Sequence, residues 1–224
     1  NYRANSYIGS IRDYFVDQSG GLFVPAFDLY FLKVNKSFSN YIDAEYMLIQ
    51  DAISALLAKY PQFDPKIYDA DGDGDVDAFA LLYAGQQVEV GDKHLGGFQY
   101  ELRWNACGKL NATNGKKFNN YFILNQNGDI FERFIHEFSH TMGLRDHYCV
   151  WSDSCYSDYT YKDVQAPGAH AWDVMATGMY SGQNNPPNYS GFERNFMGWL
   201  DYTTLENDFE VKAIPYLGAN NYAY

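Results

Sequence analysis

One short segment of the chain carries side chains that could do chemistry. His136 and His140 lie four positions apart, and Glu137 follows the first of them. Apolar residues recur at helical spacing over residues 130–142, which predicts an amphipathic helix. Residues four apart project from the same face of a helix, so both imidazoles can bind one Zn²⁺. Glu137 would then accept a proton from a water bound to the zinc and pass it to a leaving amine, which is the chemistry of a zinc peptidase.

A zinc site of this kind needs a third protein ligand, because water takes the fourth position. Asp129 is the expected N-cap of the helix, and Gly143 is its expected C-terminal stop. A positive φ at Gly143 would turn the chain back sharply and carry Asp146 or His147 toward the metal. These considerations leave both residues open as the third ligand.

A second candidate metal site lies in residues 69–77, where aspartates alternate with other residues and glycine stands at the turn. This spacing is typical of a calcium loop. The aspartates are Asp69, Asp71, Asp73, Asp75 and Asp77. All except Asp75 would fill positions one, three, five and nine of an EF-hand loop, although Ala80 stands at position twelve, where Glu is usual. We expect a structural Ca²⁺ site that pins a strand beginning at Ala78.

The elements that must position these residues follow from hydrophobic periodicity and from breakers. Helices are predicted at residues 6–18 and 43–60, and extended chain is predicted between them at 22–34. Short buried strands are predicted at 78–84 and 121–124, and weak strand character at 209–224. Residues 86–118 and 145–190 are predicted to be long loop regions, which in compact domains usually build a functional site.

Composition and charge restrict the class of protein. The length of 224 residues and a hydrophobic content of 46% suit one globular domain, or one domain divided into two lobes. The net charge of −12 excludes nucleic acid as a partner, and no apolar run is long enough for a membrane span. The 21 Tyr and 16 Phe suit an extracellular protein.

The cysteines and the first residue bear on processing. Cys149 and Cys155 are close enough to close a small loop, whereas three unrelated thiols, including Cys107, are an equal alternative. No CxxC pair exists, so zinc on cysteine is not expected. Because the chain begins at Asn1, we expect a processed or trimmed fragment whose export signal lies upstream.

The order of these pieces resembles the immune inhibitor A family of secreted bacterial metallopeptidases. The resemblance covers most of the chain, and the zinc helix with Gly143 and Asp146 is its specific part. The other matching segments are residues 13–15 and 18–21, the Asp loop followed by 82–85, residues 172–175, and 198–199. The sequence departs from the family pattern at Arg145, where Pro is commoner, and at His147, where an acidic residue is commoner.

The resemblance implies an α+β fold of the zincin, metzincin-like type, with a twisted sheet, an active-site helix and a smaller C-terminal lobe below the cleft. The whole chain, 1–224, would be one catalytic domain with an upper lobe at about 1–143 and a lower lobe at about 144–205. Residues 206–224 would begin a truncated C-terminal β domain. The usual third zinc ligand of metzincins falls on Asp146, with His147 as the alternative, and Met175 falls on their Met-turn. Tyr180, ahead of His170, is the candidate for stabilising the oxyanion.

These features together predict a secreted or cell-surface zinc endopeptidase, monomeric, that hydrolyses protein or peptide substrates with catalytic Zn²⁺ and structural Ca²⁺. One alternative is a calcium-dependent binding or adhesive module, in which the Asp loop is the working feature. Another is a zincin-like protein with little turnover. Glu137 between two helical histidines favours the enzyme over both. The substrate, the cleavage preference and any activating cleavage cannot be deduced from the sequence.

Overall fold

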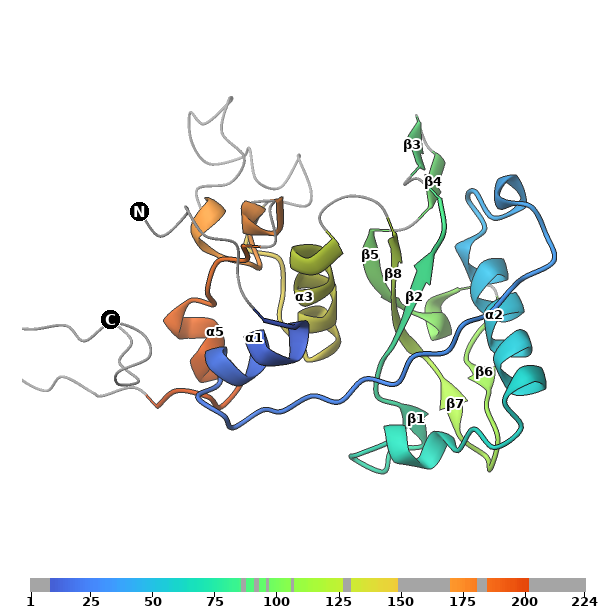
Figure 1. Ribbon diagram of the computed structural model, residues 1–224, viewed down its shortest axis with the longest axis horizontal. Helices are drawn as coiled ribbons and strands as arrows, with labels where there is room; N and C mark the ends of the chain where they lie inside the picture. Colours follow the sequence, from blue (N-terminus) through green and yellow to red (C-terminus); the bar gives the residue numbers. More distant parts are fainter. Residues whose placement is uncertain are drawn as a thin grey trace, which may run out of the picture. The chain divides into compact units, whose positions relative to one another are not determined.

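The structure is a computed structural model that describes residues 9–85, 88–90, 93–95, 97–105, 107–126, 130–148, 170–180 and 185–201. The chain forms two compact units, one of residues 28–143 and the other of Asn1–Phe27 together with Leu144–Tyr224. Helices and small mixed sheets make it an α+β protein, which confirms the predicted class at that level (Figure 1). Asp129, Cys149, Cys155 and residues 206–224 lie outside the described residues.

The sheet at the centre of the 28–143 unit has the strand order β2-β8-β5. Strand β2 (Phe79–Tyr83) runs parallel to β8 (Asn120–Asn125), and β5 (Phe98–Glu101) runs antiparallel to it on the other side. Residues 121–125 of the central strand are all buried, as expected where both faces of a sheet are covered. The positions of the strands predicted at 78–84 and 121–124 are therefore confirmed. The predicted burial holds for β8 and is wrong for β2, an edge strand in which Ala80 and Leu82 are exposed.

Two helices of the same unit cover the two faces of this sheet, because side chains alternate along β8. Tyr121 and Ile123 belong to the core cluster that contains the buried face of α2 (Glu45–Lys59), including Ile49. Phe122 points the other way and meets Phe134 of α3 (Ile130–Thr141) at a ring separation of 4.9 Å. Figure 1 shows α2 and α3 on opposite sides of the sheet. This layering fixes the helix that carries the two histidines.

The prediction of a loop over residues 86–118 is wrong in part, since five short strands lie in or at the edge of this region. A hairpin joins β3 (Val88–Val90) to β4 (Lys93–Leu95), and a second sheet has the order β1-β7-β6. Its strands are β1 (Asp75–Val76), β7 (Lys117–Phe118) and β6 (Leu110–Asn111). Strands of two to four residues are too short for an alternating pattern to stand out in the sequence.

The other unit contains α1 (Ile11–Gln18), α5 (Gly191–Phe196) and the 3₁₀ turns η4 (His170–Trp172) and η5 (Thr177–Tyr180). Helix α1 begins later than the predicted residue 6, because Ser10 caps it in a reciprocal box with Asp13. Within the described part of this unit, Phe23 stacks on Trp199 at 5.7 Å and Phe15 contacts both rings, while the buried Tyr14 and Tyr189 complete the aromatic cluster.

Short 3₁₀ turns also occur at η1 (Phe38–Asn40), η2 (Pro65–Tyr68) and η3 (Leu102–Trp104) of the first unit. Residues 23–34 belong to no helix or strand, in keeping with the extended chain predicted there, and Tyr30, Leu32 and Val34 pack on the core beside α2. Within the described ranges, none of the helices combines the length and the apolar character that crossing a bilayer requires.

Candidate metal centre

Helix α3 presents its two histidines on the side away from the sheet. Phe134 and Phe138 both contact Phe122 of β8, with ring separations of 4.9 and 6.3 Å. Successive residues of an α-helix are rotated by about 100°, so a residue two positions on lies on nearly the opposite side. His136 and His140 each follow one of these phenylalanines by two positions. The packing of the apolar stripe therefore determines the direction of the imidazoles.

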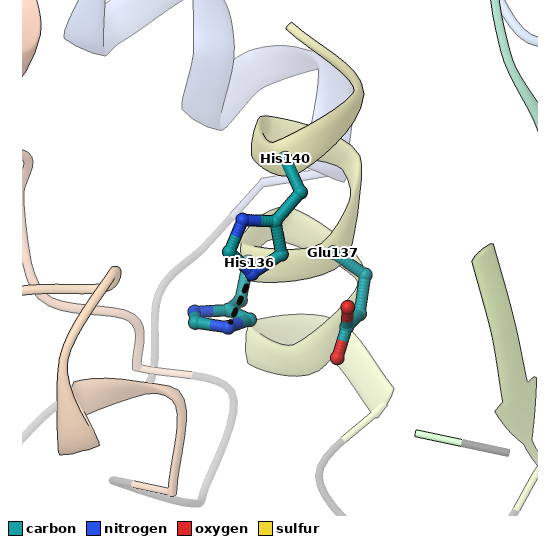
Figure 2. A group of neighbouring side chains, drawn as sticks. All are labelled: His136, Glu137 and His140. Atoms are coloured by element: carbon teal, nitrogen blue, oxygen red, sulfur yellow. Dashed lines mark hydrogen bonds between the residues drawn. The ribbon is translucent and has the colours of Figure 1, made fainter. Parts of the chain in front are cut away.

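The two imidazoles converge on one point. Their Nε2 atoms are 3.0 Å apart, and the rings meet edge to face with centroids 4.6 Å apart (Figure 2). Two nitrogens bound to one tetrahedral zinc at about 2.0–2.1 Å would be separated by roughly 3.3 Å. The observed separation is close to this value, so the pair fits a zinc ion with little movement of either ring.

Glu137 lies next to the two histidines, but its side chain points in a different direction. Figure 2 shows its carboxylate projecting from an adjacent side of α3, while one of its oxygens lies within 4.8 Å of a nitrogen of each histidine. Glu137 is only 4% exposed and His136 only 1% exposed. A carboxylate and an imidazole at this burial, with the half-buried ring of His140 beside them, are costly unless a proton or a cation is shared among them. The donor set, two neutral nitrogens and a nearby carboxylate, is the one expected around catalytic zinc.

The segment after α3 contains both candidates for the third ligand. Gly143 has φ +98°, as expected for a residue that stops the helix and turns the chain, and its amide donates to His140 O at 3.0 Å. Asp146 and His147 are both half-buried and belong to the other compact unit. The backbone amide of His147 donates to Met175 O at 2.8 Å.

A cluster that the sequence did not reveal surrounds His147. Its Nδ1 lies 2.7 Å from Asp173 Oδ2 and 3.6 Å from Glu193 Oε1. Both carboxylates are almost fully buried, and Asp173 Oδ1 also accepts the amide of Met175 at 2.7 Å. Burial, and then the charge of Asp173, raise the pKa of Glu193 to about 7. Positions 147, 173 and 193 are far apart in the sequence, so no spacing pointed to this cluster.

The remaining predicted residues of the active site lie in the same turn region. Met175 is fully buried. Its carbonyl oxygen accepts the amide of His147, and its own amide donates to Asp173. Tyr180 ends η5 and is 62% exposed, while His170 begins η4. Their predicted roles, as the Met-turn and as donors to an oxyanion, stay predictions.

The Asp loop brings together three of its five aspartates. Asp69, Asp71 and Asp77 each offer an oxygen within 4.8 Å of the others. Within the described residues, Asp73 and Asp75 are not part of this group. The side chain of Asp73 instead accepts the amide of Asp75 at 2.7 Å, which closes a local turn.

Two lysines that sequence reasoning missed reach into this loop. Lys116 contacts Asp69 and Lys109 contacts Asp75, the latter at 2.5 Å. The hydrogen bond from Lys116 lowers the pKa of Asp69, whereas burial and the nearby aspartates raise the pKa of Asp77. The other oxygen of Asp69, Oδ1, is buried and has no hydrogen-bond partner among the described residues. This carboxylate oxygen of the loop is therefore available to a cation.

Comparison with known proteins gives no family: no protein-family model matches this chain, and no curated protein matches it significantly.

Proposed function

We propose that this chain is the catalytic domain of a secreted zinc-dependent endopeptidase with a zincin-type fold. The observation that carries the proposal is the convergence of His136 and His140, whose Nε2 atoms lie 3.0 Å apart beside the Glu137 carboxylate. Two histidines one helical turn apart, with a buried glutamate after the first, stand beside the phenylalanine stripe by which α3 packs on β8. They suit metal-assisted hydrolysis.

Zinc, when bound, would supply a Lewis acid that polarises the scissile carbonyl and acidifies water. The chain's own residues carry the rest of the reaction. Glu137 accepts the proton of the attacking water and later delivers it to the amine that leaves when the C–N bond breaks. Its burial restricts the access of bulk water to this carboxylate. Tyr180, with an exposed side chain, is the proposed donor to the oxyanion.

Asp146 is proposed as the third zinc ligand, and His147 is the alternative. The choice of Asp146 rests on its position in the sequence, three residues after Gly143, and on the suitability of a carboxylate as a zinc ligand. The positive φ observed at Gly143 supports the reversal of the chain that either ligand requires.

The resemblance to the immune inhibitor A family is compatible with the packing in the second unit. Segments that carry the resemblance come from opposite ends of the chain, yet Phe15 and Trp199 lie in edge-to-face contact with ring centroids 6.4 Å apart. Gln18 of the same stretch accepts, through its backbone carbonyl, a hydrogen bond from Arg194 at 2.8 Å. A shared packing role for these segments supports reading them as parts of one pattern.

The Asp loop is proposed to bind a structural Ca²⁺ through Asp69, Asp71 and Asp77. Carboxylate oxygens are the ligands that calcium prefers, and the buried Oδ1 of Asp69 lacks another partner among the described residues. This proposal uses three of the five predicted aspartates, because within the described residues only these three offer oxygens within 4.8 Å of one another. The loop leads directly into β2, so an ion here would order the start of the central sheet.

Three proteins distinguish the possibilities: the wild type, Glu137→Gln and His140→Gln. We expect the wild type to bind about one zinc and to cleave casein until a chelator removes the metal. Glu137→Gln should retain the zinc and lose activity by about 10²–10⁴-fold, because general acid-base catalysis contributes about that much. His140→Gln should lose the zinc as well. This pair separates the role of the base from that of the ligand.

The other outcomes correspond to the alternative functions. A wild type that binds only calcium refutes the peptidase and leaves the calcium-dependent binding module. A zinc-loaded wild type that cleaves no more casein than Glu137→Gln is a zincin-like protein with little turnover.

A further inference from the structure

The segment that bears the proposed third ligand is tied to a distant turn by a single residue. His147 donates its backbone amide to Met175 O at 2.8 Å, and its Nδ1 lies 2.7 Å from Asp173 Oδ2. Asp173 in turn accepts the amide of Met175 through its other oxygen. Main chain and side chain of His147 are therefore both held by the same three-residue turn.

A second carboxyl group, from helix α5, lies near the same nitrogen without a hydrogen bond to it. Glu193 Oε1 lies 3.6 Å from His147 Nδ1, and Glu193 Oε2 accepts the amide of Ser190 at 2.5 Å in the capping box that begins the helix. Because the capping box restricts the rotamer of Glu193, its carboxyl group stays in place beside the imidazole. The side chains of Asp173 and Glu193 are 2% and 0% exposed, whereas that of His147 is 28% exposed.

We infer that His147 is a positioning residue of the proposed metal centre, not its third ligand. Its Nδ1–H donates to Asp173, which fixes the backbone of residues 146–147 on the 173–175 turn and so presents the carboxylate of Asp146. The inference rests on the proposed function.

The chemistry of the Asp173 carboxylate assigns the proton on the imidazole. An ionised carboxylate only accepts hydrogen bonds, so the nitrogen 2.7 Å from Asp173 must carry the hydrogen. Breaking this contact would leave a buried carboxylate without its charged or polar partner, which is costly. The contact therefore restricts the rotamer of His147, and through it the path of the adjoining backbone.

An imidazole whose Nδ1–H meets a carboxylate is also the arrangement of many zinc-bound histidines, whose Nε2 binds the metal. The two roles need different atoms of His147, and two amide side chains separate them. In His147→Asn the amide nitrogen occupies the place of Nδ1, but no atom reaches the place of Nε2. In His147→Gln the amide lies one carbon further out, where it resembles Nε2 and leaves the Nδ1 position without a donor.

The experiment measures the dissociation constant for zinc by competition with a chromophoric chelator, on variants whose native circular dichroism and melting have been checked. We expect His147→Asn to bind zinc within about threefold of the wild type. His147→Gln should bind about 10–100-fold more weakly, which is the usual effect of removing a group that orients a ligand. Asp146→Asn should lose the zinc to the chelator.

The outcomes separate the inference from the proposed function. If His147→Asn folds but binds zinc tenfold or more weakly than the wild type, the positioning role is refuted and His147 is the ligand. If Asp146→Asn keeps the affinity of the wild type, the inference also fails. If the wild type binds no zinc, both the proposed function and the inference about His147 are refuted. Should His147→Gln not fold, the comparison of His147→Asn with Asp146→Asn decides the question alone.

Discussion

Replacing Gly178 by alanine should destabilise the turn that carries Asp173 and Met175. A Cβ atom at this position would lie 2.3 Å from the carbonyl oxygen of Asp173 and 2.4 Å from Cγ of Pro187. Ordinary contacts between such atoms begin near about 3.4 Å, so each contact would be too short by about 1 Å. The same carbonyl oxygen accepts the amides of Ala176 and Gly178, each at 3.1 Å. The turn cannot relax without weakening these bonds.

The size of the effect follows from these contacts. Overpacking of a buried site costs about 1–3 kcal/mol, and each weakened hydrogen bond costs about 0.5–1.5 kcal/mol. With two such bonds at stake, Gly178→Ala should therefore lose about 2–6 kcal/mol, which at about 2–4 °C per kcal/mol lowers the melting temperature by about 4–24 °C.

Thermal unfolding followed by near-ultraviolet circular dichroism measures this loss. Thr177→Ala, at the neighbouring half-buried position, is the matched control and should melt within about 3 °C of the wild type. A Gly178→Ala variant that melts with its control would refute the close approach of the backbone at this turn.

Two further predictions concern charged groups of the 28–143 unit. Asp51 accepts hydrogen bonds from Lys36 at 2.8 Å and from the hydroxyl of the buried Tyr41 at 2.9 Å, and the bond from Lys36 is the main cause that lowers the pKa of Asp51. A lowered carboxyl pKa adds stability that is fully present above the unfolded value and is lost as the pH falls through the folded value. Asp51→Asn should thus lower the free energy of unfolding, measured with urea, by about 1 kcal/mol at pH 7 and by progressively less below pH 3.8. An equal loss at pH 2.5 would contradict the assignment of this stability to the ionised carboxylate of Asp51. Lys116→Met removes the ammonium group that contacts Asp69, so calcium should bind severalfold more tightly. A terbium-displacement titration measures this affinity. Unchanged or weaker binding would show that Lys116 does not compete with the ion.

The sequence predicted those parts of the site that depend on local geometry. His136 and His140 share a face because any helix places residues four apart on one side, and α3 was evident from its apolar spacing. Strands β2 and β8 were evident too, because each is a short continuous apolar run, although only β8 is buried on both faces while alternate residues of the edge strand β2 are exposed. Gly143 signalled a stop because a positive φ suits glycine, and the observed φ is +98°.

Contacts between distant segments could not be predicted in this way. Gln18 donates to Asn188 and accepts from the amide of Tyr189, about 170 residues later in the chain. Nothing in the pattern around Asp173 or Glu193 pointed to His147, since each is an ordinary acidic residue next to a turn or a helix start. Such contacts depend on how the elements pack, and packing is fixed by the whole chain and not by a window of residues.

The topology of the 28–143 unit explains why its two candidate metal sites are connected. Strands β2 and β8 are parallel, with Phe79 opposite Tyr121, so both begin at the same edge of the sheet. Helix α3 follows β8 and packs on it, which brings the end of the helix back toward that edge. Asn120, the first residue of β8, donates its amide to Asp77 O at 3.0 Å and to Thr141 O at 3.3 Å. One side chain thus joins the end of the Asp loop to the helical residue after His140, and in the proposed enzyme an ion that orders the loop would also stabilise the last turn of the zinc helix.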